Sequence, residues 1–291
     1  MTRRAVKKDG HSPARDPARD EAPVHADPNT LSLAAIEEFS EDPNFVTSLA
    51  RGLSVLLALS DKRRHLSIAQ VSYCTGIPRA AVRRSLLTLS MLGFAATDDS
   101  NHFYLRPRVL SFGHGYLSAS PIAVLSQPIL DRLSETIDQA CSLAVMDGDD
   151  IVYLARSTSS RIMSPLLGVG RRQSAYCTSS GQVLLAQLPP TRLEAYLARV
   201  RMIPLTPYTI GSVQELREQI ERAREVGYAF VSQQTLLNLC SLAVPVCDIR
   251  GDYVGGINVI RHGKPLSRHE MAARYLEPLQ AAARELGTLL V

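Results

Sequence analysis

Three arginines with helical spacing form a group of side chains suited to binding a polyanion. Arg79, Arg83 and Arg84 fall largely on one face of a helix whose other face carries apolar side chains. Guanidinium groups donate paired hydrogen bonds to phosphates and to guanine edges. Thr88 on the same helix and Arg51 on an earlier helix are further candidate contacts. These five residues predict a DNA-binding surface; the alternative is an ordinary solvated face of a bundle that packs against protein.

Two short helices and a hairpin position this surface. Ser67 can cap a helix that ends at Gly76, and Pro78 can open the basic helix over residues 79–91. Polar residues 98–101 then separate two short apolar strings, which predicts a two-stranded wing. A preceding helix over residues 45–59 is expected to bury one stripe, made of Val46, Leu49, Leu53, Leu56 and Leu57. The order predicts a winged helix-turn-helix domain over residues 45–106.

The charge distribution agrees with this assignment. The chain has 291 residues and a net charge of +4, which is enough length for two domains. Residues 45–119 hold nine Lys and Arg against three Asp and Glu, a net charge of +6. Residues 1–44 carry −3 and five prolines, so we expect a disordered tail there. The positive charge is therefore concentrated where DNA binding is predicted.

The string Thr178-Ser179-Ser180-Gly181 comes immediately before a predicted helix. Thr178 or Ser179 can cap that helix, which leaves first-turn N–H groups available for an anion. The string lies between predicted hairpins at residues 142–155 and 241–260, after a linker helix over residues 107–120. This alternation over residues 121–291 predicts an α+β domain with one antiparallel sheet. The donors at the helix start predict that this domain binds a small anion. The alternative for these serines is capping and strand packing alone.

Other chemistries have little support in the sequence. The five cysteines are scattered without a CxxC pair, so we expect free thiols, no metal and no cofactor. Nucleophile-elbow, dinucleotide and phosphate-loop patterns are absent, so we do not expect an enzyme. No apolar run reaches the length of a membrane span and the N-terminus lacks a signal sequence. These absences predict a cytoplasmic protein that does not bind a membrane.

Several motifs from residue 45 onward resemble the IclR family of bacterial transcriptional regulators. They are LARGL, LRPRVL, SSGQVLLA, REVGYA, LAVPV and GGINV, at residues 49–53, 105–110, 179–186, 224–229, 242–246 and 255–259. The strings DGDDIVY at 147–153 and RIMS at 161–164, with Tyr176, resemble the branch that regulates aromatic-acid breakdown through protocatechuate and β-ketoadipate.

The resemblance implies a winged helix, a linker helix and a GAF-like effector domain. It implies dimers or tetramers on palindromic operators, a small carboxylate effector and no catalysis. The implied effector-binding residues are Ser179, Ser180, Gly181, Val231, Ser241 and Asn258. Ser241, Asn258 and Val231 stand where relatives commonly have cysteine, serine and aspartate. We therefore expect a ligand-responsive, DNA-binding regulator of aromatic catabolism; the alternative is a protein-interaction or sensor module without specific DNA binding.

Overall fold

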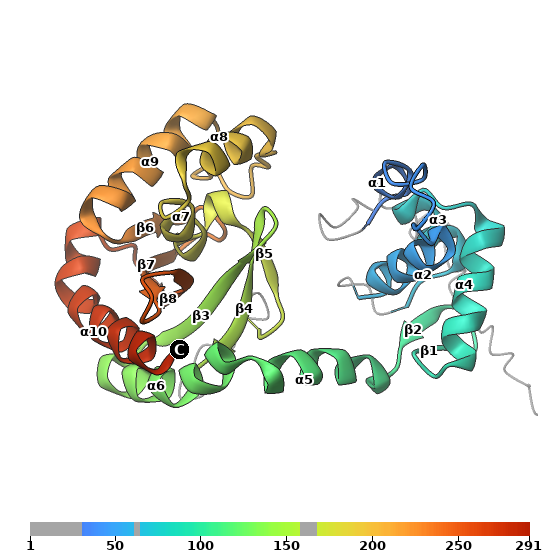
Figure 1. The fold of residues 1–291 in the computed structure, drawn as a ribbon, viewed down its shortest axis with the longest axis horizontal. Coiled ribbons are helices and arrows are strands. Elements are labelled where there is room, and N and C mark those ends of the chain that lie inside the picture. Colours follow the sequence, from blue (N-terminus) through green and yellow to red (C-terminus); the bar gives the residue numbers. More distant parts are fainter. Residues whose placement is uncertain (1–30, 61–64, 158–167) are drawn as a thin grey trace, which may run out of the picture. The chain divides into compact units, whose positions relative to one another are not determined.

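A computed structural model describes residues 31–60, 65–157 and 168–291 in two compact units that meet at Leu110 and Ser111. The N-terminal unit is mainly helical, with a small hairpin (Figure 1). Its elements are α1 (Leu33–Glu37), α2 (Thr47–Ala58), α3 (Ile68–Thr75), α4 (Arg79–Met91), β1 (Ala95–Thr97) and β2 (Phe103–Leu105). The predicted winged helix-turn-helix is confirmed in both order and kind of element.

Local chemistry sets the boundaries of the two central helices. Ser67 accepts a hydrogen bond from the Gln70 N–H, and the Gln70 side chain accepts one from the Ser67 N–H, so the two form a capping box. Gly76 ends α3 with φ 73°, a left-handed conformation that glycine adopts without strain. Pro78 then precedes the first residue of α4. These side chains fix the turn between the two helices.

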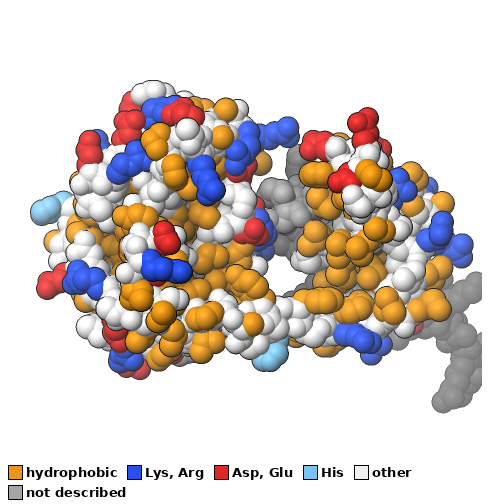
Figure 2. All heavy atoms as spheres, viewed as in Figure 1, with side chains coloured by type: hydrophobic (Ala, Val, Ile, Leu, Met, Phe, Trp, Pro, Cys, Tyr) orange, Lys and Arg blue, Asp and Glu red, His pale blue; other side chains and the backbone are white. Residues whose placement is uncertain are grey.

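The predicted buried stripe of α2 is wrong. Val46, Leu49 and Leu53 are 58%, 61% and 48% exposed, and Leu57 is also exposed. The helix instead buries a face made of Ala50, Ser54, Val55 and Ala58. The side chains of α2 are apolar on most sides of the helix. The side with small residues allows α2 to pack closely on α3 and α4. Apolar side chains consequently gather on the outer face of the unit (Figure 2).

The predicted disordered tail also needs correction. Residues 33–37 form α1, and Ser32 caps it by accepting a hydrogen bond from the Ala35 N–H. Ile36 is only 1% exposed and belongs to the apolar core of the N-terminal unit. The many prolines of residues 1–44 hid this short apolar pattern. Residues 1–30 lie outside the described part of the chain.

The C-terminal unit contains a six-stranded sheet in the order β5-β4-β3-β8-β7-β6, with every neighbouring pair antiparallel. The predicted hairpins, β3 with β4 and β7 with β8, are confirmed. The short β5 and the turn η4 were not predicted. The strands are β3 (Ala140–Asp147), β4 (Asp150–Arg156), β5 (Arg172–Ser174), β6 (Ala229–Ser232), β7 (Leu239–Cys247) and β8 (Tyr253–His262), and η4 spans Ala175–Cys177.

Helices cover both faces of this sheet (Figure 1). One apolar core lies between the sheet and α6 with α10, and a second lies between the sheet and α7, α8 and α9. Pro128 lies inside α6, and although a proline commonly breaks a helix, α6 is continuous there. The helices are α5 (Leu110–Ala119), α6 (Pro121–Ile137), α7 (Ser179–Leu185), α8 (Pro190–Arg199), α9 (Val213–Val226) and α10 (Arg268–Leu289). The architecture is α+β, as predicted.

The burial of Ile36 gives a test of α1. Replacing Ile36→Ala removes buried methyl groups and should lower the free energy of unfolding of the N-terminal unit by about 2–5 kcal/mol. Chemical denaturation followed by circular dichroism measures this. Glu38→Ala, at an exposed position next to the same helix, is the control and should change little. Equal stability of the Ile36→Ala variant and the parent would show that α1 does not pack.

Candidate functional site

The outer face of α4 carries the predicted DNA-binding side chains. Arg79, Arg83, Arg84 and Thr88 are all exposed. Arg79 and Arg83 are one turn apart, whereas Arg84 is rotated by about 100° from Arg83 around the helix. The basic side chains therefore form a broad surface and not one narrow stripe. Three guanidinium groups within two turns are well placed to approach phosphates and base edges together.

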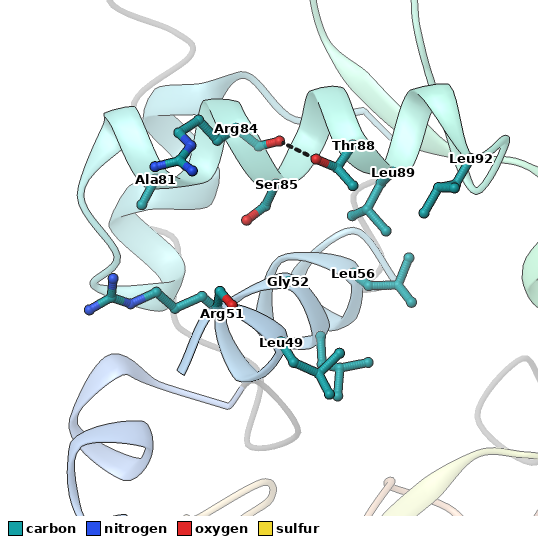
Figure 3. A pocket seen from close by; sticks show the side chains of 12 residues that line it. Leu49, Arg51, Gly52, Leu56, Ala81, Arg84, Ser85, Thr88, Leu89 and Leu92 are labelled. Atoms are coloured by element: carbon teal, nitrogen blue, oxygen red, sulfur yellow. Dashed lines mark hydrogen bonds between the residues drawn. The ribbon is translucent and has the colours of Figure 1, made fainter. Parts of the chain in front are cut away.

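A groove between α2 and α4 adjoins this surface (Figure 3). Arg51 and Arg84 both extend toward one end of the groove, and Leu56, Leu89 and Leu92 lie toward the other. The Arg51 Nε is buried and has no hydrogen-bond partner among the described residues. The Thr88 hydroxyl donates a hydrogen bond of 3.0 Å to the Arg84 carbonyl oxygen, which leaves its lone pairs to accept. The groove thus has a basic end and an apolar end.

The C-terminal unit gathers polar side chains inside the sheet face that α7 covers. Ser179 and Ser180 on α7, Ser241 on β7 and Asn258 on β8 are 1%, 0%, 5% and 2% exposed. The Ser179 and Ser241 hydroxyl oxygens are 2.5 Å apart. The Asn258 amide nitrogen donates a long hydrogen bond of 3.5 Å to the Ser241 hydroxyl. Four of the six predicted effector residues therefore belong to this buried polar region.

The other two predicted residues shape the same region. Val231 on β6 is 2% exposed and lies opposite Ser241 in the β6–β7 pairing, so it supplies an apolar wall. Gly181 lies where α7 approaches η4: a Cβ there would be 2.2 Å from the Ala175 carbonyl oxygen. The Gly181 N–H donates to the Thr178 hydroxyl at 3.1 Å. The cap therefore occupies one of the N–H groups that were expected to bind an anion.

The sequence did not reveal two further members of the polar region. Ser142 on β3 is fully buried and pairs with Asn258 in the β3–β8 register. Tyr153 on β4 is buried, and its hydroxyl donates a hydrogen bond of 3.1 Å to the Gln173 side-chain oxygen. Both residues lie in strands whose other residues are mostly apolar. A serine inside an apolar strand was the only available signal.

Three polar atoms in this region have no hydrogen-bond partner among the described residues. They are the hydroxyl oxygens of Ser142 and Ser180 and the amide oxygen of Asn258. A buried polar group without a partner costs about 1–3 kcal/mol, so native proteins keep few of them. Three such atoms in one buried region make it a candidate ligand site. We name Ser142, Ser179, Ser180, Ser241 and Asn258 the buried polar cluster.

Four arginines of the effector domain are candidate counter-ions for an anionic ligand: Arg156, Arg161, Arg171 and Arg172. Arg172 forms ion pairs with Asp147 and Asp150, so its charge is already compensated. Arg171 is partly buried, and its Nε lacks a partner among the described residues. Arg161 lies outside the described residues. Arg156, at the end of β4, is partly buried, and burial lowers the pKa of its guanidinium.

The structure offers little for other chemistry. All five thiols are free, and burial raises the pKa of Cys141 and Cys177 to about 12, which disfavours the nucleophilic thiolate. In the described part of the chain, no three His, Cys, Asp or Glu residues are grouped to hold a metal ion. Among the described helices, none has both the length and the apolar character needed to cross a bilayer.

A winged helix-turn-helix joined to an α+β unit with an interior polar site defines a ligand-responsive DNA-binding regulator. Two family models match the chain: the IclR helix-turn-helix domain over residues 48–99 and the bacterial transcriptional regulator IclR C-terminal domain over residues 114–288. The chain therefore belongs to the IclR family of bacterial transcriptional regulators.

Individual relatives agree with this membership. The chain is 44% identical to the Pca regulon regulatory protein of Pseudomonas putida over 93% of this chain and 94% of that protein. It is 31% identical to the p-hydroxybenzoate hydroxylase transcriptional activator of Acinetobacter baylyi, over 85% and 93%. A solved Acinetobacter structure, a double mutant of the PobR inducer-binding domain with 3-hydroxybenzoic acid, is 25% identical with a TM-score of 0.53. It covers 57% of this chain and 97% of that chain.

The close contact between Gly181 and the Ala175 backbone can be tested by adding a side chain at Gly181. Gly181→Ala should force the start of α7 away from η4 and lower the free energy of unfolding by about 1–3 kcal/mol. Urea denaturation monitored by circular dichroism measures the change. Gly211→Ala is the matched control, because a Cβ at Gly211 would meet nothing within 4 Å. Equal losses in both variants would mean that space at Gly181 does not limit the packing.

Proposed function

We propose that this chain controls genes of aromatic-acid breakdown and that a small carboxylate is its effector. The buried polar cluster carries the proposal, because its unpaired atoms need a polar ligand and its walls are apolar. The relatives support the pathway: one is the Pca regulon regulatory protein and one is the p-hydroxybenzoate hydroxylase transcriptional activator. We further propose that the protein acts in the cytoplasm, where its DNA partner is found, and has no catalytic activity.

The proposed DNA interface consists of α4 and the neighbouring end of α2. We assign base-edge and phosphate contacts to Arg79, Arg83, Arg84 and Thr88, and a phosphate contact to Arg51. The proposed DNA-binding domain spans residues 45–106, the linker 107–120 and the effector domain 121–291. A protein-interaction module without specific DNA binding is the competing function, and the exposed leucines of α2 are the observation that favours it.

Arginine replacement separates these two functions. Arg83→Ala combined with Arg84→Ala should weaken binding to the native upstream DNA by about 30-fold or more, since a bidentate base contact contributes roughly 1–3 kcal/mol. Fluorescence anisotropy at fixed salt measures the affinity. Arg201→Ala removes one positive charge from an exposed position of the C-terminal unit and should leave affinity nearly unchanged. Undiminished affinity in the double variant would favour the protein-interaction module.

We also propose that two copies pair through the exposed apolar face of α2. Leu49 and Leu53 line the groove with Leu56 and Leu89, and DNA cannot cover such a surface because it is polyanionic and hydrated. Paired winged helices can read two half-sites, which matches the palindromic operators that the family implies. A second copy is therefore the occupant that fits both the apolar face and the DNA-binding role.

A charge placed in this face tests the pairing. Leu53→Glu should convert the dimer or tetramer to a species of half the mass, because two carboxylates would be buried without partners. Light scattering after size-exclusion chromatography gives the mass, and circular dichroism checks the fold. Tyr73→Glu, at a 68% exposed position on α3, is the control and should not change the mass. An unchanged assembly in the Leu53→Glu variant would place the pairing surface elsewhere.

A further inference from the structure

Arg156 shares a sheet face with the buried polar cluster. In the β3–β4 pairing, Ser142 lies opposite Arg156 and Leu143 lies opposite Ala155. Cys141 and Leu143, on either side of Ser142, belong to the core on the α6 and α10 side, so Ser142 lies on the α7 face. Arg156, directly opposite Ser142 in the antiparallel pair, shares that face. In the β3–β8 pairing, Ser142 also lies opposite Asn258. The three residues therefore form a row across adjacent strands, on the face that α7 covers.

The chemistry of this row fits an acid group. A guanidinium binds a carboxylate with two parallel hydrogen bonds, and the unpaired Ser142 hydroxyl beside it can donate a third. Arg156 lies close enough to the buried Tyr153 phenol for the two groups to influence each other's pKa. Arg156 is partly buried, so water competes less for a carboxylate there than at the open surface.

The opposite part of the cluster has a different character. The side chains of Ser179, Ser180, Ser241 and Asn258 are neutral, and Thr178 already occupies the Gly181 N–H. A carboxylate buried there would have no cation beside it, which carries a high desolvation cost. A hydroxyl or carbonyl group would instead satisfy the unpaired Ser180 and Asn258 atoms at little cost.

We propose that Arg156, together with Ser142, binds the carboxylate of the effector, and that Ser180, Ser241 and Asn258 hold an uncharged polar group at its other end. This inference rests on the proposed function and reverses the ligand orientation expected from the Ser-Ser-Gly motif. It assigns a carboxylate-binding residue on β4 and restricts the effector to small acids with a second polar group. A hydroxybenzoate or an oxo acid meets this requirement, and an unsubstituted benzoate does not.

A comparison of acid and amide ligands tests the assignment. Calorimetry first measures the binding of 4-hydroxybenzoate and 3-oxoadipate, and the tighter acid is then compared with the amide made from its carboxyl group. The parent protein should prefer the acid by about tenfold or more, the effect of one charge-assisted pair. In Arg156→Gln this preference should fall to about twofold or less, and Arg156→Lys should retain most of it.

Arg172→Gln is the matched control. It removes another arginine of the same sheet, but one that lies opposite Val152 on the α6 and α10 face and pairs with Asp147 and Asp150, so the acid preference should persist. Thermal melting without ligand checks that each variant is folded. An undiminished acid preference in folded Arg156→Gln would overturn this assignment and leave the proposed effector class intact. Failure of the parent protein to bind either acid would overturn both.

Discussion

The C-terminal unit depends on the close contact between α7 and η4. Gly181 has no side chain, so α7 can approach the Ala175 backbone and place two serines directly on the sheet. Seven consecutive residues of this short helix are buried, which is possible because apolar side chains from α8 and α9 pack around it. The Ser179 hydroxyl consequently contacts that of Ser241, which also accepts a hydrogen bond from the Asn258 amide, in a buried interior. The proposed ligand site is a result of this packing.

Features set by neighbouring residues were predictable from the sequence. Ser67, Gly76 and Pro78 fixed the turn before α4, because capping and left-handed glycine act within a few positions. The hairpins were predictable for the same reason. The buried face of α2 could not be predicted, because this helix is apolar on most sides and could pack through several faces. In the structure, the face with the small residues packs against the rest of the unit. Ser142 was missed because only strand register brings it beside Asn258 and Arg156.

The two units use polar groups in opposite environments. On α4 the arginines are exposed, where long-range attraction to a polyanion matters and desolvation is small. In the effector domain the polar atoms are buried, where each unpaired group raises the energy of the ligand-free state. A ligand that pairs those atoms therefore stabilises the domain, and any arrangement of the domain that binds it better becomes more populated.

The only described segment that connects the two units without interruption is α5, and its composition limits what it can transmit. This helix is about 15 Å long, contains Gly113 and Gly115, and buries none of its residues. Each glycine costs roughly 1 kcal/mol of helix stability relative to alanine, so an isolated α5 is near the margin between helix and coil. The two glycines and the lack of buried residues therefore make α5 the helix of the described chain that should unwind at the lowest free-energy cost.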